Sequence, residues 1–423
     1  MPHPDRPAPA DPPDSVDLPP SVDPPPSVDP PPSVDPPPSV DPPPSVDPHR
    51  ARPLPVLRAM IDGLDREILQ LLARRSVLVA EIARSKRESH TPIRDLPRER
   101  FVLSDRRERG RRLGLSPELI ESLYRLILWD SRNEQAALRA EVPLDMEPRT
   151  VAVIGGEGRM GRLIADLFIE LGHTVMSADL ATPLTPEDAA AAADVVIVSV
   201  PIERTVEVIR RLGPRVRPEG VLADVTSLKR EPMEAMLAST RASVVGTHPL
   251  FGPGVHSVQG QRVVMVRGRG DGWFAWLATM FHARGLNVVE CGAEEHDRWM
   301  SIVQVLSHFA SEVMGKTLQA LNVPVEESLA FTSPPYLIDL LMVARHFAQT
   351  ADLYAPIQIL NPSTPEVTRA FVAAAQELRA QVVGGDRAAL ARTYDEVRAF
   401  FGSFTDLALD QSSFLIDRLV ERA

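Results

Sequence analysis

The chain has 423 residues and a formal net charge of −11 at pH 7, a length that provides for two or three domains, each with a sizeable core. The charge argues against broad binding to nucleic acid or to anionic membranes, and no apolar run reaches the ~18 residues that a membrane span needs. The N-terminus lacks the pattern of a secretory signal, and the single cysteine, Cys291, excludes an intrachain disulfide. We therefore expect a cytoplasmic protein with no nucleic-acid or membrane partner and no metal.

Residues 1–52 form a low-complexity tail. Within it Ser-Val-Asp recurs every six residues, from Ser15 to Ser45, and the copies are separated mainly by Pro-Pro-Pro. Such a tract has almost nothing to bury and cannot form a helix or a sheet ladder. We expect a disordered, polyproline-like tail. An inert tail is favoured over a docking segment.

Residues 53–140 predict an all-α module of three helices. The first helix runs to about Arg87, the second opens at Asp95, and the third opens at Ser116. Apolar residues of the first helix keep the 4-3 spacing of a helix seam, namely Leu57, Ile61, Leu64, Ile68, Leu71, Leu78 and Ile82. This helix is too long for the two shorter ones to cover, so the pattern predicts a homodimer along the seam.

Two cations interrupt the seam, at Arg75 and Lys86. Eleven residues separate them, which on an α-helix is about 20° in azimuth and roughly 16 Å in rise. Cations on a buried face need a partner, and that partner is either an internal carboxylate, such as Glu81 or Glu99, or an anionic ligand gripped between them. The other two helices carry a polar set that favours the ligand, comprising Arg98, Glu99, Ser131 and Gln135. Arg58 lies about 100° away from Arg75 around the helix, so we expect it to point elsewhere, into a partner's site.

This pattern closely resembles the all-helical chorismate mutases. The residues that carry the resemblance are Arg58, Arg75, Lys86, Asp95, Arg98, Glu99, Ser131 and Gln135. It implies an intertwined dimer in which Arg58 crosses to the other protomer's pocket, and it implies chorismate, a dianion, as the substrate. It further implies that Arg58 and Arg75 bind carboxylates and that Lys86 and Gln135 donate to the ether oxygen. Glu99 and the region of Asp95 would hold the ring hydroxyl.

After a linker at 141–149, residues 150–293 alternate strand and helix patterns, which predicts a parallel, doubly wound α/β sheet of the Rossmann type. The first strand is followed by Gly156-Glu-Gly158-Arg-Met-Gly161 and a helical run, and Asp179 stands about 20 residues further on. In this context the glycines and the acid predict an NAD site, although a structural glycine turn is the alternative. The predicted cofactor-binding set is Gly156, Gly158, Arg159, Met160, Gly161, Asp179, Ser199 and Pro201.

Two further segments end predicted strands at the edge that faces ligands in such folds. One carries Ser227 and Lys229, and the other carries His248 within Gly-Thr-His-Pro-Leu-Phe-Gly-Pro. A lone histidine is usually structural, but its place beside the expected nicotinamide favours a catalytic role for His248. Lys229 is assigned to the same pocket, with a role in substrate binding.

Residues 294–423 read as an all-α C-terminal domain for substrate binding and dimerisation. Arg345 follows Leu337 and Leu341 on one line of a predicted helix, so it interrupts an apolar stripe and suggests an anionic ligand. His308 lies in an apolar helix, where a core histidine and a substrate contact are equally compatible with the pattern.

From residue 150 the chain resembles the prephenate dehydrogenases, and as a whole it resembles the bifunctional chorismate mutase/prephenate dehydrogenases of tyrosine biosynthesis. The resemblance implies that His248 polarises the 4-hydroxyl of prephenate and that Arg345 anchors the ring carboxylate. It also makes tyrosine an expected inhibitor. Arogenate is the competing substrate. A β-hydroxyacid-type dehydrogenase fused to a helical dimerisation module, and a non-catalytic sensor of NAD and an aromatic acid, are the alternatives.

Overall fold

The computed structural model describes residues 52–89, 91, 93–138 and 146–420. The repeat tail at 1–51 and most of the predicted linker therefore lie outside the described residues. Among the described residues, no helix is long and apolar enough to span a membrane.

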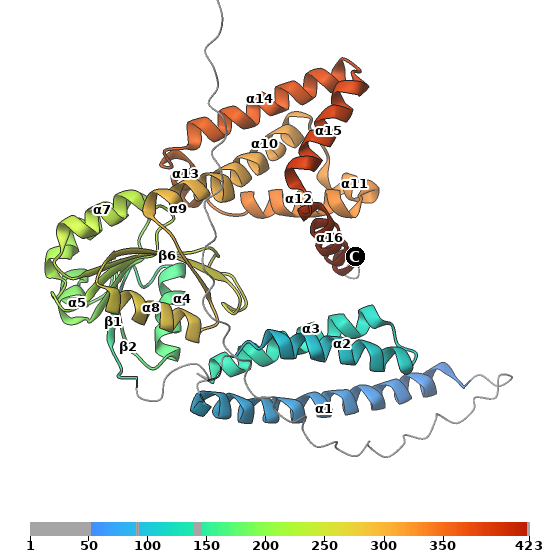
Figure 1. Ribbon diagram of the computed structural model, residues 1–423, viewed down its shortest axis with the longest axis horizontal. Helices are drawn as coiled ribbons and strands as arrows, with labels where there is room; N and C mark the ends of the chain where they lie inside the picture. Colours follow the sequence, from blue (N-terminus) through green and yellow to red (C-terminus); the bar gives the residue numbers. More distant parts are fainter. Residues whose placement is uncertain (1–51, 90, 92, 139–145, 421–423) are drawn as a thin grey trace, which may run out of the picture. The chain divides into compact units, whose positions relative to one another are not determined.

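Three helices open the described chain: α1 (Leu54–Ser89), α2 (Leu96–Arg112) and α3 (Pro117–Ala137) (Figure 1). Two of them begin where the sequence predicts, because their first turns are capped. Oδ1 of Asp95 accepts from the backbone N–H of Arg98 at 2.9 Å, and Oγ of Ser116 accepts from that of Leu119 at 3.2 Å. α2 and α3 pack closely at Gly110, where a Cβ atom would stand 2.6 Å from Cγ1 of Ile120.

The predicted seam of α1 is exposed on the single chain. Ile68 is 53 % exposed, Leu71 60 % and Leu78 58 %. A row of this kind along a helix of 36 residues leaves a large apolar surface in water. The helix therefore presents an apolar face that its own chain does not cover at these three positions.

Within the described residues, seven strands form one sheet in the order β2-β1-β3-β4-β5-β6-β7. The strands are β1 (Thr150–Ile154), β2 (Thr174–Ala178), β3 (Val195–Val198), β4 (Val221–Asp224), β5 (Ser243–Pro249), β6 (Arg262–Arg269) and β7 (Asn287–Glu290). The first five pair in parallel, as the alternation of patterns predicts. The sheet departs from the predicted parallel arrangement at β6, which is antiparallel to β5.

Helices cover both faces of this sheet (Figure 1). Val151 and Val153 of β1 point to one face, where α4 (Arg159–Glu170) and α8 (Asp271–Ala283) pack. Ala152 and Ile154 point to the other, which α5 (Pro186–Ala192), α6 (Ile202–Leu212) and α7 (Arg230–Ser239) cover. Because strands buried on both faces read as continuous apolar runs, the pattern of these strands was recognisable in the sequence.

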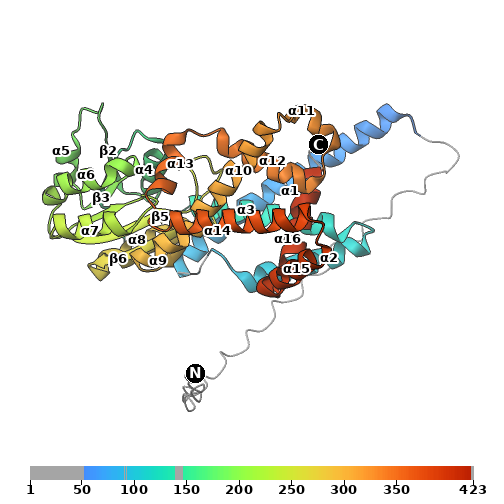
Figure 2. The ribbon, with the colours of Figure 1, turned by 90° about the horizontal axis from the view of Figure 1, so that it is seen from above.

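Beyond β7 the described chain is helical, as predicted. The run α9 (Ala293–Met300), the π-helix Ser301–Leu306 and α10 (Ser307–Ala320) comes first. After it come α11 (Val325–Ser328), α12 (Pro334–Phe347), α13 (Ala351–Ile359), α14 (Thr364–Val383), α15 (Arg387–Phe401) and α16 (Phe404–Val420). Figure 2 shows α14 as a long straight helix of this domain. The π-helix is the local irregularity in the run, and such turns are frequent at functional sites.

Candidate active sites

The first predicted site is partly assembled by α1 and α3. The guanidinium of Arg75 donates a short hydrogen bond to Oγ of Ser131, and Ser131 Oγ donates to the carbonyl of Ile127 at 2.6 Å. Among the described residues, no carboxylate forms a salt bridge with Arg75. The internal ion pair considered for Arg75 is therefore absent there, and a cation that is half-buried without a counter-charge suits an anionic ligand.

Lys86 and Gln135 flank the small buried cluster of Ala83, Ile93 and Ala136. Nζ of Lys86 donates to the carbonyl of Ile93 at 2.7 Å, and Nε2 of buried Gln135 donates to the carbonyl of Ser131 at 3.0 Å. Oε1 of Gln135 is buried and has no hydrogen-bond partner among the described residues. An orphaned polar atom of this kind is costly unless a ligand or water meets it.

The remaining predicted residues of this module differ in burial: Glu99 is largely buried, whereas Asp95, Arg98 and Arg58 are exposed. Glu99 is ion-paired with Arg132 at 2.7 Å, and both side chains are largely buried. Asp95 serves as the cap of α2, while Arg98 is exposed with its guanidinium 5.3 Å from the ring centre of Phe101. Arg58 is exposed on α1. Sequence reasoning missed Arg132, whose only signal is its place one residue after Ser131.

The glycine loop between β1 and α4 has the geometry of a dinucleotide site. Gly155 has φ +83°, and its N–H donates to the carbonyl of Ala178 on β2 at 2.8 Å. At Gly156 a Cβ atom would stand 2.7 Å from Cβ of Ser177, and at Gly161 it would collide with the carbonyl of Gly155. Glycine is therefore required at both positions, and the backbone N–H groups at the start of α4 stay accessible to a pyrophosphate.

The acidic residue of this motif lies beside the loop. Oδ2 of Asp179 accepts from the backbone N–H of Glu157 at 3.2 Å, which places the carboxylate at the end of β2 against the glycine turn. This is where a ribose 2′-hydroxyl would meet an acceptor. Arg159 and Met160 form the first turn of α4, and Ser199 and Pro201 follow β3, with Ser199 N–H bound to the carbonyl of Ile154 at 2.8 Å. The residues present fit NAD.

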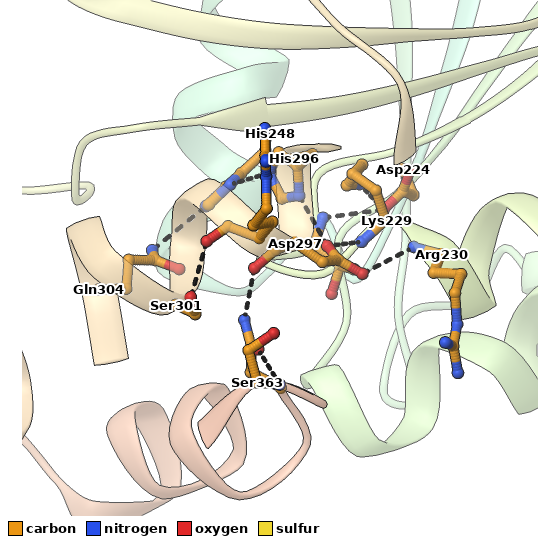
Figure 3. A network of polar contacts seen from close by, with 12 residues as sticks. Asp224, Lys229, Arg230, His248, His296, Asp297, Ser301, Gln304 and Ser363 are labelled. Atoms are coloured by element: carbon orange, nitrogen blue, oxygen red, sulfur yellow. Dashed lines mark hydrogen bonds and ion pairs between the residues drawn. The ribbon is translucent and has the colours of Figure 1, made fainter. Parts of the chain in front are cut away.

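His248 lies at the C-terminal end of β5 and is 3 % exposed. Its Nδ1 is 2.9 Å from Nε2 of His296, and its Nε2 is 3.5 Å from the side-chain nitrogen of Gln304 on the π-helix (Figure 3). Burial, followed by the nearby His296 and Lys229, holds the pKa of His248 well below its usual range. The imidazole is therefore neutral at physiological pH and keeps one nitrogen as an acceptor.

Lys229 has no exposed surface. Its ammonium donates to Oδ2 of Asp224 at the end of β4 and to the carbonyl of Thr247 at 2.7 Å, one residue before His248 (Figure 3). Burial lowers the pKa of Lys229 and raises that of Asp224, while their mutual attraction opposes both shifts. The side chain thus ties β4 to β5 beneath the histidine. Ser227 is half-buried in the same β4–α7 loop.

Arg345 and His308 lie on α12 and α10. Arg345 is exposed, and Leu341 on its predicted stripe is 49 % exposed; the buried side of α12 is formed by Leu340, Val343 and His346. The ring of His308 lies 5.3 Å from that of His346 and 4.6 Å from that of Tyr354. Burial, followed by the nearby His346, lowers the pKa of His308 to about 4. His346 and Tyr354 also line a neighbouring cavity of about 450 Å³.

Sequence reasoning missed the polar groups behind His248. His296 and Asp297 belong to α9, 48 residues or more after His248 along the chain, and Gln304 belongs to the π-helix. The adjacent His-Asp pair after the last strand is a signal that could have drawn attention to α9. Its partner could not be identified without the fold.

These features are those of a helical module with half-buried cations, joined to a dinucleotide-binding α/β domain that has a buried histidine at the edge of its sheet. Family models match the same three segments. Residues 57–136 match chorismate mutase type II, residues 176–288 match the prephenate dehydrogenase nucleotide-binding domain, and residues 292–396 match the prephenate dehydrogenase dimerization domain.

Two relatives match this chain along nearly their whole length. The chain is 35 % identical over 364 residues to the T-protein of Enterobacter agglomerans, covering 86 % of this chain and 97 % of the relative. It is 33 % identical over 362 residues to the T-protein of Haemophilus influenzae, with 86 % and 96 % covered. The fold of the second half resembles the A. aeolicus prephenate dehydrogenase solved with hydroxyphenyl propionate and NAD+, with a TM-score of 0.51, 16 % identity, and coverage of 60 % of this chain and 98 % of that one.

The chain belongs to the T-protein family. It is a bifunctional enzyme, a chorismate mutase joined to an NAD-dependent prephenate dehydrogenase of tyrosine biosynthesis. The alternatives of a purely structural helical module and of a non-catalytic sensor do not agree with these matches.

Proposed function

We propose that Arg75, Lys86 and Gln135 form the centre of the mutase pocket. The observation that supports this assignment is the guanidinium of Arg75, which forms no salt bridge with any described residue and donates to Ser131. Ser131 lies one helical turn from Gln135, whose buried Oε1 has no hydrogen-bond partner among the described residues. Arg75 and, from the partner protomer, Arg58 bind the two carboxylates of chorismate. Asp95, Arg98, Ser131 and the Glu99–Arg132 pair surround the ring and its hydroxyl.

The rearrangement of chorismate needs no nucleophile and no proton transfer. It needs a compact conformer and stabilisation of the negative charge that develops on the breaking ether oxygen. Lys86 supplies a point charge on a flexible stem, which suits a single oxygen better than the planar fork of arginine. Gln135 has a second amide hydrogen beyond the one bonded to Ser131, and this hydrogen donates to the same oxygen.

We propose that His248 is the hydrogen-bond acceptor for the 4-hydroxyl of prephenate. NAD, when bound at the glycine loop and Asp179, supplies the acceptor for the hydride. Because burial keeps His248 neutral, it can draw the hydroxyl proton and raise the electron density on the carbon that loses its hydrogen. Arg345 and His308 belong to the substrate side of this site and orient the ring carboxylate that leaves as carbon dioxide. The product is 4-hydroxyphenylpyruvate.

Ser227 and Lys229 have different parts in this proposal. Ser227 is free to contact substrate from the β4–α7 loop, whereas Lys229 is enclosed and bonded to Asp224 and Thr247. We therefore place Lys229 in a supporting position under His248 and not against the substrate.

The exposed seam of α1 supports a homodimer, in which Arg58 of each protomer reaches the other's mutase pocket. The dimerization-domain match of residues 292–396 is consistent with a second association surface. We further propose that the enzyme acts in the cytoplasm and that tyrosine, the product of its pathway, inhibits it.

The substitution His248→Asn tests the dehydrogenase assignment. Turnover of prephenate should fall by roughly 10²- to 10⁴-fold, the usual contribution of a general acid or base, while the KM for prephenate stays close to that of the wild type. Arogenate is assayed beside prephenate to determine which is preferred. A variant that retains turnover would refute the role of His248.

A further inference from the structure

A chain of polar contacts runs from His248 into the interior of the protein. Nδ1 of His248 lies 2.9 Å from Nε2 of His296, and Nδ1 of His296 lies 2.7 Å from Oδ1 of Asp297 (Figure 3). All three residues are almost fully buried. Water is therefore not available to replace either contact, and each must have a donor and an acceptor.

The far end of the chain is fixed as an acceptor. Oδ1 of Asp297 accepts from the backbone N–H of Lys229 at 2.8 Å, and Oδ2 accepts from that of Arg230 at 3.0 Å, at the start of α7. Burial alone would raise the pKa of Asp297, but the hydrogen bonds from His296, Arg230 and Lys229 lower it. An ionised carboxylate has no proton to give. Asp297 is held in place from behind as well, because the side chain of Asn361 donates to its carbonyl at 2.9 Å.

The direction of every hydrogen bond then follows. Because Asp297 accepts, His296 donates from Nδ1; a neutral imidazole has one proton, so its Nε2 is an acceptor. His248 must therefore carry its proton on Nδ1 and donate it to His296. This leaves the lone pair of His248 on Nε2, the nitrogen that is turned toward Gln304 and away from His296.

The charged groups around the histidines agree with neutral rings. His248 is faced by His296 from α9, by the Lys229–Asp224 pair from the β4–α7 segment, and by the amide of Gln304 from the π-helix. Burial lowers the pKa of His296, and Lys229 lowers it further, against the opposing effects of Asp297 and Asp224. A second proton on either ring would place an additional cation beside a buried ammonium.

We propose that His296 and Asp297 are positioning residues of the dehydrogenase, which hold His248 in the Nδ1–H tautomer so that Nε2 accepts the hydrogen bond of the substrate hydroxyl. This proposal rests on the proposed role of His248. It adds the reason why Nε2, the nitrogen that faces the substrate, is the one that accepts. A neutral histidine in free solution can carry its proton on either nitrogen, so the relay selects the productive form.

The substitution Asp297→Ala removes the acceptor at the end of the relay. An amide would not serve, because its oxygen in the place of Oδ1 could still accept from Lys229 and His296. Without the carboxylate, the proton of His296 is no longer held on Nδ1; when it lies on Nε2, His248 must accept at Nδ1, and its Nε2 becomes a donor pointing at the substrate. We expect kcat for prephenate to fall by roughly 10- to 100-fold, the loss that corresponds to one hydrogen bond to a charged group.

The KM for prephenate and the affinity for NAD should stay close to those of the wild type, because neither ligand loses a contact. Chorismate mutase activity of the same preparation reports that the chain has folded. A variant that lost NAD affinity together with kcat would indicate a merely structural role and overturn the proposal, as would a variant with wild-type kcat.

Substitutions of His296 provide the conservative rescue. His296→Phe removes the acceptor for His248, and kcat should fall by two orders of magnitude or more, on the order of a lost general-base contact. In His296→Gln the side-chain oxygen can accept from Nδ1 of His248, and kcat should recover at least in part. Equal activity of the two variants would count against the relay.

Nitrogen-15 spectra of the full-length enzyme labelled at histidine report the tautomer of His248 directly in the wild-type protein. At neutral pH the wild type should show His248, assigned by comparison with His248→Asn, protonated at Nδ1 and bare at Nε2. A proton on Nε2 would overturn the relay. If His248→Asn leaves turnover intact, the proposed role of His248 is wrong. If His248→Asn is inactive but Asp297→Ala has normal turnover, only the relay is wrong.

Discussion

The two sites of this enzyme differ in where their functional side chains lie. In the mutase module, Arg75 and Lys86 project from a helix whose apolar seam is open, and the pocket includes Arg58 of a second protomer in our proposal. In the dehydrogenase, His248 is 3 % exposed and its contacts come from β5, α9 and the π-helix of one chain. In our proposal the first site consists of cations that bind an anionic ligand. The second depends on two neutral histidines, His248 and His296, whose protons must lie on the correct nitrogens.

The largest effect that separates the two sites should follow from breaking the buried pair of Lys229 and Asp224. Lys229→Met leaves an uncompensated carboxylate at the end of β4, which costs about 3–5 kcal/mol of unfolding free energy. Urea denaturation followed through dehydrogenase activity measures this loss, and mutase activity should survive to higher urea. In the double variant Lys229→Met/Asp224→Asn most of the stability should return; a double variant as unstable as the single one would contradict this account of the pair.

Removing the ammonium from the mutase pocket should have the next largest effect. Lys86→Ala deletes a donor to the developing oxyanion, so kcat/KM for chorismate should fall by roughly 10²- to 10³-fold. Lys316→Ala is the matched control, because among the described residues that exposed lysine bonds only to nearby Gln319. Oxidation of added prephenate should be normal in both variants. Near-normal mutase turnover in Lys86→Ala would sink the assignment.

A charge on the seam of α1 should weaken association. Leu78→Asp places an unpaired carboxylate in the predicted interface, and its burial costs more than the ~1.4 kcal/mol that corresponds to a tenfold change in Kd. Sedimentation of dilute protein should therefore show self-association weakened by at least about tenfold, together with reduced mutase activity. Glu81→Gln, an exposed change on the same helix, serves as the control. Unchanged assembly in Leu78→Asp would place the interface elsewhere.

As pH falls, the dehydrogenase half should lose stability before the mutase half. This is the smallest of the expected effects, and it is least near neutral pH. The pKa of His308 is lowered to about 4, so the unfolded chain binds its proton first, and stability is lost as pH falls from about 6.5 toward 4. In the mutase helices, hydrogen bonds from Arg111 and Arg112 lower the pKa of Glu108 to about 2. The stability that ionised Glu108 contributes is therefore lost only as pH falls below about 4.5. Residual activities after incubation across this range measure the order of loss, and earlier loss of the mutase would contradict it.

The sequence predicted what is set by local pattern. Helix starts at Asp95 and Ser116 follow from capping, and the glycine loop with Asp179 follows from the steric demands of a strand-turn-helix. Arg75 was selected because it interrupts an apolar line, and Ser131 because it belongs to the polar set on the other two helices. The fold brings the two side chains into contact. These positions could be located from the sequence because helix period and turn chemistry act over a few residues.

What the sequence could not predict depends on contacts between distant segments. Lys229 was expected beside the substrate, but its ammonium is engaged by Asp224 and Thr247, since a lysine five residues after a buried strand-end acid can fold back onto it. The relay of His296 and Asp297 depends on α9 returning to the end of β5, and the antiparallel β6 depends on sheet pairing. The sequence predicted that Arg345 interrupts a buried apolar stripe, but Arg345 and Leu341 of that stripe are exposed. Apolar spacing alone does not say which face of a helix the rest of the chain covers.

The separation of the two chemistries is tested most directly by assaying both activities in two single variants of the full-length enzyme. Chorismate is supplied without NAD to measure prephenate formation, and prephenate is supplied with NAD to measure NADH and 4-hydroxyphenylpyruvate. Lys86→Ala should lose only the first activity and His248→Asn only the second, and mixed extracts of the two should convert chorismate to 4-hydroxyphenylpyruvate. Loss of both activities in either variant, with the protein folded, would contradict two independent sites.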